Sequence, residues 1–206
     1  THIARVALYI TDHQLNEEVG GRFGNTRATV PLVATPHIHC GNALRMDWNS
    51  VVRAEDCNYV FGNPPFIGYK YQSEIQKDDL TLVYGNDSGT GVLDYVCAWY
   101  VLAGRYITNN TTIKCAFVST NSITQGEQVA VLWSLLLPMH ITINFAHRTF
   151  DWNNEGRAVA AVHCVIIGFS NVKNCDINAG VNINIVQYYD DNQSYSKEVM
   201  MFRDKL

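Results

Sequence analysis

The sequence lacks a long apolar run, a Cys-x-x-Cys pair and an excess of basic residues. Its longest apolar stretch, near residues 129–138, is too short to cross a bilayer, which excludes a transmembrane helix there. Its six cysteines stand at positions 40, 57, 97, 115, 164 and 175, without the spacing of a zinc site or a disulfide framework. We therefore expect buried free thiols in a reducing cytoplasm, and no metal ion.

The balance of charge is slightly acidic. The 206 residues include 15 Lys and Arg against 19 Asp and Glu, for a net charge of −4. A domain that holds DNA by itself normally presents a basic face. Any binding to nucleic acid is therefore weak, or it depends on a basic surface outside these residues. Because 47% of the residues are hydrophobic, the chain can bury a core and is not disordered.

Alternating apolar and polar segments predict an α/β fold. Apolar residues at helical spacing predict helices over residues 2–15, 92–106 and 125–137, and Asp94 fits the N-terminus of the second helix, where a negative charge is favoured. Short apolar runs predict strands over residues 38–43, 58–61, 113–119, 141–146 and 160–169. Residues 69–91 are polar and glycine-containing, and predict a mobile loop or a short helix near a site.

The last two predicted strands are joined without a helical segment, which favours an antiparallel pair at one end of a mostly parallel sheet. The polar, tyrosine-rich tail from residue 182 onward resembles a linker.

The most informative motif is Asn63-Pro64-Pro65-Phe66, directly after a predicted strand. Each proline fixes its own φ and restricts the residue before it, so the loop is rigid. The side-chain oxygen of Asn63 and the carbonyl oxygen of Pro64 can then accept from one amino group, while Phe66 offers a ring to a flat partner. The alternative is purely structural: the prolines end the strand and Asn63 caps the turn.

A resemblance covers residues 1–170 and decides between these interpretations. Several blocks stand in the order found in gamma-class adenine-N6 DNA methyltransferases, in the methyltransferase segment of large single-chain restriction–modification proteins. The blocks are FGNPPFIG (61–68), LDYVCAWY (93–100), FVSTNSITQGEQ (117–128), FAHRTFDW (145–152) and AVHCVIIGF (161–169). The resemblance implies a partial class I (Rossmann-like) S-adenosylmethionine-dependent methyltransferase sheet, mostly parallel, with an antiparallel strand pair near the C-terminus.

The family also implies roles for individual residues. Asn63 and Pro64 would hold the amino group of an adenine flipped out of double-stranded DNA, in a catalytic loop completed by Pro65 and Phe66. Phe66 and Phe150 would stack on the two faces of the base, with Trp152 as a rival to Phe150. Asn42 and Ala43 would lie near the adenine of the methyl donor, S-adenosyl-L-methionine.

Three parts of the family pattern are missing from this sequence. The glycine-rich donor loop and the acidic residue that grips the donor's ribose would precede Thr1, and a target-recognition domain would follow a linker at residues 171–206. We therefore expect the catalytic part of a longer bacterial protein, with weak donor binding on its own. We expect its sheet to lack central strands and to expose an edge open to self-association. RNA adenine, a protein glutamine amide, or a non-catalytic remnant of the fold remain alternatives.

Overall fold

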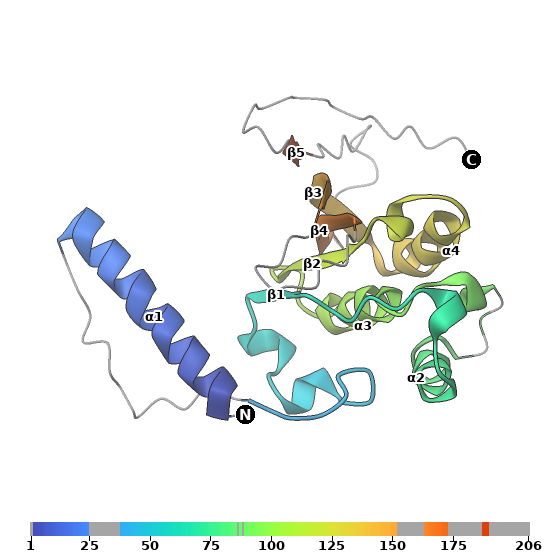
Figure 1. Ribbon diagram of the computed structural model, residues 1–206, viewed down its shortest axis with the longest axis horizontal. Coiled ribbons are helices and arrows are strands. Elements are labelled where there is room, and N and C mark those ends of the chain that lie inside the picture. The colour runs from blue at the N-terminus through green and yellow to red at the C-terminus, as the bar shows by residue number, and fades with distance from the viewer. Residues whose placement is uncertain are drawn as a thin grey trace. The chain divides into compact units, whose positions relative to one another are not determined.

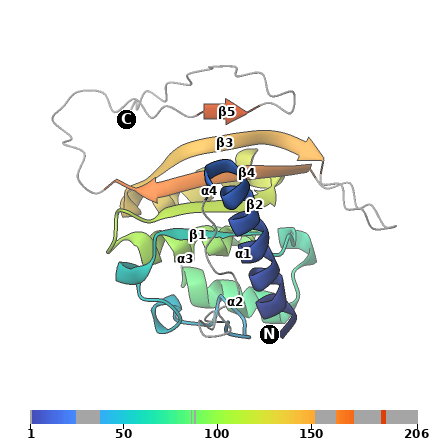
Figure 2. The ribbon, with the colours of Figure 1, turned by 90° about the vertical axis from the view of Figure 1, so that its left-hand side faces the viewer.

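The computed structural model describes residues 2–24, 38–85, 87, 89–151, 163–172 and 187–189. The chain divides into two compact units, Thr1–Val52 and Arg53–Leu206, and each is described by itself. Figures 1 and 2 show the elements of both.

The first unit contains one long helix, α1, at His2–Phe23, which confirms the predicted helix and extends it to Phe23. The predicted strand at residues 38–43 is wrong, because these residues form no strand. Local hydrogen bonds take up the backbone here. The side-chain oxygen of Asn42 accepts from Leu44 N at 3.0 Å, and the backbone oxygen of Asn42 accepts from Arg45 N at 3.0 Å. In addition, Trp48 Nε1 donates to the backbone oxygen of Ala43 at 3.0 Å. A short 3-10 helix, η1 (Trp48–Ser50), follows.

The second unit is built on a five-stranded sheet with the order β1-β2-β4-β3-β5. Its strands β1, β2, β3 and β4 agree in place with the predicted ones, and β5 follows them. Their bounds are β1 Tyr59–Gly62, β2 Lys114–Thr120, β3 Ile141–Asp151, β4 His163–Asn171 and β5 Gln187–Tyr189.

The pairing of the strands confirms the mixed sheet. β1 pairs with β2 in parallel, and β3 and β4 form the predicted antiparallel pair. β4 is also antiparallel to β2, and β3 pairs in parallel with β5. β4 therefore runs against all its neighbours, and β1, β2 and β3 share one direction. The described strands form a continuous sheet with β1 at its edge. No gap interrupts the described strands, and the expectation that central strands of the complete sheet are missing stays a prediction.

Two of the three α-helices of this unit cover one face of the sheet, and the first of the three packs against the second (Figure 1). The three helices are α2 Glu74–Tyr84, α3 Cys97–Ile107 and α4 Glu127–Leu136. Short 3-10 helices connect the elements: η2 Ala54–Asp56, η3 Tyr69–Tyr71, η4 Thr90–Val92, η5 Asn121–Thr124 and η6 Leu137–Met139. α2 lies in the segment predicted as a loop or short helix, and a capping box of Ser73 and Gln76 begins it.

The core lies between the helices and the sheet. Alternate residues of β2, namely Cys115, Phe117 and Ser119, are buried beneath the helices, while the residues between them are half-buried. Tyr100 on α3 stacks on Phe169 of β4, with ring centroids 5.3 Å apart. Its hydroxyl lies 2.7 Å from Ser119 Oγ, so the polar end of this buried ring has a partner.

β1 is an exposed edge. Tyr59 and Phe61 are 71% and 81% exposed, and β1 pairs only with β2 among the strands of the described residues. An aromatic edge strand with free backbone groups is a template for pairing with another strand.

No helix in the described part of the chain is long and apolar enough to cross a membrane.

Candidate active site

The Asn63-Pro64-Pro65-Phe66 loop begins at the carboxyl end of β1, one residue after Gly62. Asn63 and Pro65 are exposed, Phe66 is half-buried and Pro64 is buried. Among the described residues, none forms a hydrogen bond with the side chain of Asn63. The buried proline therefore anchors the loop while the amide beside it faces solvent, and no turn-capping bond occupies that amide.

Both ends of this loop are fixed. Its beginning is held by β1, whose Gly62 is paired with Phe117 of β2. Its end is held by two backbone donors: Tyr95 N donates to Ile67 O at 2.9 Å, and Tyr69 N donates to Asp94 Oδ1 at 3.0 Å. The side chain of Gln72 adds a bond to Leu93 O at 3.0 Å. The segment after Phe66 is thus fastened to residues 93–95.

Asp94 occupies a place that the sequence does not predict. The expected place is the N-terminus of a helix, but α3 begins at Cys97, and Asp94 is a buried carboxylate in the preceding turn, 4% exposed. Besides Tyr69 N, its oxygens accept from Thr120 Oγ1 at 3.3 Å and from Ser122 Oγ. An acidic residue inside an apolar run, LDYV, was the signal available in the sequence, because such a residue needs donors when it is buried.

Phe150 lies at the same edge of the sheet. It pairs with Cys164 of β4, and Cys164 pairs with Thr120 at the carboxyl end of β2. β1 and β3 are three strand spacings apart, about 14 Å. Along this edge, the Asn63 loop follows β1 and Phe150 lies on β3. The ends of β2 and β4 lie between them. Trp152, the rival for the stacking role, lies outside the described residues.

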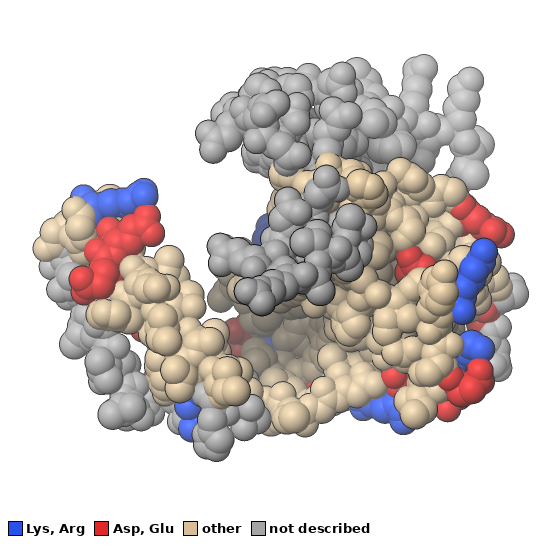
Figure 3. Space-filling model, in the orientation of Figure 1, with Lys and Arg blue, Asp and Glu red and all other residues tan. Residues whose placement is uncertain are grey.

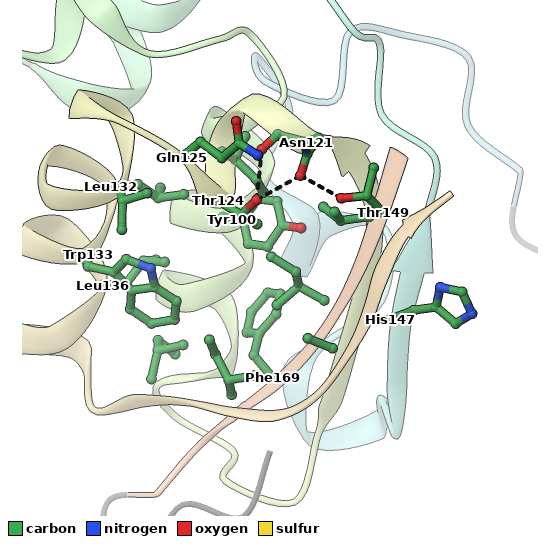
Figure 4. A pocket seen from close by; sticks show the side chains of 17 residues that line it. Tyr100, Asn121, Thr124, Gln125, Leu132, Trp133, Leu136, His147, Thr149 and Phe169 are labelled. Atoms are coloured by element: carbon green, nitrogen blue, oxygen red, sulfur yellow. Dashed lines mark hydrogen bonds between the residues drawn. The ribbon is translucent and has the colours of Figure 1, made fainter. Parts of the chain in front are cut away.

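A polar cluster fixes the end of β3 next to Phe150. Thr149 Oγ1 donates to Asn121 Oδ1 at 2.8 Å, and Thr124 Oγ1 donates to the same oxygen at 3.0 Å. Asn121 begins η5, directly after β2, so this cluster ties the ends of two strands together (Figure 4). The ring of His147 packs edge-on against Phe150, with centroids 5.2 Å apart.

A cavity of about 670 Å³ lies between α4 and the sheet, and sequence reasoning did not find it. Its walls are mainly apolar, and its polar lining includes Asn121 and Thr149 (Figure 4). His147 is drawn pointing away from the other lining side chains. On α4, the lining residues Val129, Leu132, Trp133 and Leu136 follow the spacing i, i+3, i+4, i+7, which was the signal in the sequence.

The described cysteines are all free thiols. Burial raises the pKa of the Cys97 thiol, and the nearby charge of Asp94 adds to this increase. Burial also raises the pKa of Cys115 to about 12. Such thiols stay protonated at neutral pH and do not act as nucleophiles. In the described part of the chain, no group of three or more His, Cys, Asp or Glu is arranged to hold a metal ion.

Asn42 and Ala43 belong to the first compact unit. Asn42 is exposed, and its side-chain oxygen accepts from Leu44 N, so its amide group is held in one orientation. The carbonyl of Ala43 already accepts from the Trp48 ring nitrogen.

Comparison with known proteins gives the family. The family model described as "MmeI, DNA-methyltransferase domain" matches residues 1–196. DNA methyltransferase A of Bacillus subtilis (strain 168) is 43% identical over 170 residues, which cover 81% of this chain and 19% of that protein. A solved structure of the Type IIL restriction-modification enzyme MmeI in complex with DNA is 52% identical with a TM-score of 0.78, and the match covers 93% of this chain and 25% of that chain.

These matches define a DNA-methyltransferase segment of the restriction–modification type, as the resemblance in the sequence indicated. The chain belongs to the MmeI DNA-methyltransferase domain family. It spans about a fifth of the curated relative's length and a quarter of the solved one's.

Proposed function

We propose that this chain is the catalytic part of an adenine-N6 DNA methyltransferase, carried by a longer restriction–modification protein of the bacterial cytoplasm. The donor is S-adenosyl-L-methionine and the substrate is an adenine flipped out of double-stranded DNA. The observation that carries the proposal is the exposed amide of Asn63 beside the buried Pro64, at the carboxyl edge of the sheet. Ligands bind at this edge in open α/β sheets, which also supports a Rossmann-like class I assignment.

The loop is suited to one chemical difficulty. The lone pair of adenine's exocyclic amine is delocalised into the ring, so the amine is a poor nucleophile. Two acceptors, the Asn63 Oδ1 and Pro64 carbonyl oxygens, would take its two N–H groups and favour a tetrahedral nitrogen with its lone pair free. Because the prolines set these acceptors before substrate arrives, little reorganisation is needed at the moment of reaction.

Two aromatic side chains complete the base site in this proposal. Phe66 follows the prolines and is half-buried, so its ring has support from the protein and a free surface. Phe150, half-buried at the end of β3, would take the other face of the base. Stacking on an aromatic ring contributes about 1–3 kcal/mol per base. Asn42 would contact the donor, whose bound sulfonium supplies the methyl group.

The distribution of charge in the chain suits a catalytic part that lacks its own target-recognition domain. The net charge is −4, and the face drawn in Figure 3 shows acidic and basic groups interspersed at the periphery of the second unit. We propose that the boundary near residue 170 separates catalysis from a region leading to target recognition. Two parts of the sheet lie beyond that boundary. They are Asn171, the last residue of β4, and the strand β5.

The test is Asn63→Ala in the complete polypeptide, with unmethylated genomic DNA and labelled S-adenosylmethionine. We expect methyl transfer to fall by more than about 100-fold while thermal stability is unchanged. Asn109→Ala is the matched control, since Asn109 is also exposed and precedes β2, near the opposite edge of the sheet. Mass spectrometry of the digested DNA should show N6-methyladenine.

Other outcomes identify the alternatives. Methylated cytosine in DNA would refute the adenine assignment. Transfer only to RNA adenine or to a protein glutamine would identify one of the other acceptors. Full methylation by Asn63→Ala would refute the proposed role of the loop, and absence of transfer by the unmodified protein to every acceptor would favour a non-catalytic remnant.

A further inference from the structure

Asp94 is a buried carboxylate whose bonds lead to separate parts of the candidate active site. It is 4% exposed, and its side-chain oxygens accept from Tyr69 N, Thr120 Oγ1 and Ser122 Oγ. Its own backbone N–H donates to Gln128 Oε1 of α4 at 2.9 Å. One residue therefore contacts the segment after the Asn63 loop, the carboxyl end of β2, and the helix that follows.

These contacts join the two parallel strands at their functional ends. β1 leads into the Asn63 loop, and β2 leads into the segment Thr120–Ser122. Tyr69 is six residues after Asn63; the two prolines restrict the chain next to Asn63, and the bond from Tyr95 N to Ile67 O holds it nearer to Tyr69. A displacement at Tyr69 would therefore be transmitted to Asn63 instead of being absorbed by a flexible loop.

We propose that Asp94 is a positioning residue for methyl transfer: its carboxylate sets the place of the Asn63-Pro64 acceptors relative to the end of β2. This inference rests on the proposed function of the loop. Asp94 contacts neither substrate nor donor in this proposal, and acts through Tyr69 and Thr120. Its loss should slow the chemical step rather than weaken binding of the donor, because a misplacement of about 1 Å can cost about 100-fold in rate.

Substitutions at Asp94 give graded expectations. Asp94→Ala removes both acceptor oxygens and should lower the single-turnover rate of methyl transfer by about 100-fold. Asp94→Asn keeps an oxygen for Tyr69 N and places an amide toward the hydroxyls of Thr120 and Ser122, which can rotate and accept. We therefore expect Asp94→Asn to retain a rate within about tenfold of the unmodified protein.

A second pair of variants leaves the buried carboxylate in place. Tyr69→Pro removes the N–H that donates to Asp94 Oδ1, and proline is tolerated at the first position of a helical turn such as η3. Tyr69→Ala keeps that N–H and is the matched control for loss of the ring. We expect Tyr69→Pro to be about tenfold slower than Tyr69→Ala. In Asp94→Ala, the same proline should add no further loss, because the bond is already absent.

The experiment is carried out on the complete polypeptide, with labelled S-adenosylmethionine and unmethylated genomic DNA, below the melting temperature of every variant. Asp78→Ala and Asp78→Asn, at an exposed carboxylate of α2, are the surface controls, and Asn63→Ala is the catalytic control. The dissociation constant of S-adenosylmethionine, measured by calorimetry, should stay within about twofold throughout. A role in overall folding would instead change this constant and the rate together.

The outcomes separate this inference from the proposed function. If Asn63→Ala is inactive and Asp94→Ala transfers at the rate of the Asp78 variants, the inference is wrong and the proposed function stands. If Asn63→Ala keeps full activity, the proposed role of the loop, on which this inference rests, is wrong. If Asp94→Ala does not fold, the Tyr69 pair decides: equal rates for Tyr69→Pro and Tyr69→Ala overturn the inference.

Discussion

The hydrogen bond between Tyr100 and Ser119 provides a quantitative test of the core. It joins α3 to β2 over 2.7 Å, and the two residues are 2% and 0% exposed. Tyr100→Phe keeps the ring that stacks on Phe169 but leaves the Ser119 hydroxyl without its partner. Ser119→Ala leaves the tyrosine hydroxyl with only the carbonyl of Phe117, at 3.5 Å. A buried polar group without a partner costs about 1–3 kcal/mol.

We therefore expect each single substitution to lower the free energy of unfolding by about 1–2 kcal/mol. The double variant replaces both partners by apolar groups and should lose little more than one single variant. This gives a coupling energy of about 1 kcal/mol. Per kcal/mol, the melting temperature should fall by about 2–4 °C for a chain of this size.

Urea unfolding followed by tryptophan fluorescence measures these free energies. The slope of the unfolding free energy against urea concentration should be the same in all variants, which shows that the substitutions do not change the compactness of the folded or unfolded state. Tyr71→Phe is the control, because Tyr71 is 85% exposed and loss of its hydroxyl should change stability by less than about 0.5 kcal/mol. If the two single effects add within about 0.3 kcal/mol, the bond does not stabilise the core and the reasoning is refuted.

Three further predictions concern the thiols, the sheet edge and the donor. Because burial raises the pKa of Cys115 from 9.0 to about 12, its contribution to stability is complete below pH 9 and is lost as pH rises to 12. Cys115→Val should reduce this alkaline loss in urea titrations at several pH values, and an unchanged profile would contradict it. Replacing Tyr59 and Phe61 by Lys should abolish self-association of the isolated chain in ultracentrifugation; a monomeric unmodified chain at high concentration would exclude edge pairing. The isolated chain should bind S-adenosylmethionine weakly or not at all, so micromolar affinity in calorimetry would be the opposite result.

Much of the second unit could be predicted from periodicity. The alternation in β2 and the helical spacing in α4 indicate which faces are buried, because these patterns repeat with the geometry of the strand and the helix. The antiparallel pair of β3 and β4 followed from the absence of a helix between them. The sequence also contains the capping box that begins α2, Ser73 followed by Gln76. This motif favours a helix over a loop for the segment after it.

The wrong predictions concern residues whose structure depends on contacts with other parts of the chain. Residues 38–43 have the apolar character of a strand, but a strand requires a neighbour, and local bonds around Asn42 satisfy the backbone instead. Asp94 fitted the general preference of acidic residues for helix N-termini. In the structure its carboxylate is used by donors 25 to 28 positions away, which no local preference describes.

The sequence by itself determined the family and the order of most helices and strands, and it is the source of the chemistry that we propose for the Asn63-Pro64 loop. Those properties depend on residue type and on short-range spacing, which are visible without coordinates. Only the tertiary structure decided which distant groups meet at the edge of the sheet: Phe150 level with the end of β2, and Asp94 between Tyr69 and Thr120. The physical reason is that strand register and buried hydrogen bonds are satisfied by the whole fold at once, whereas sequence periodicity records only which side of each element is buried.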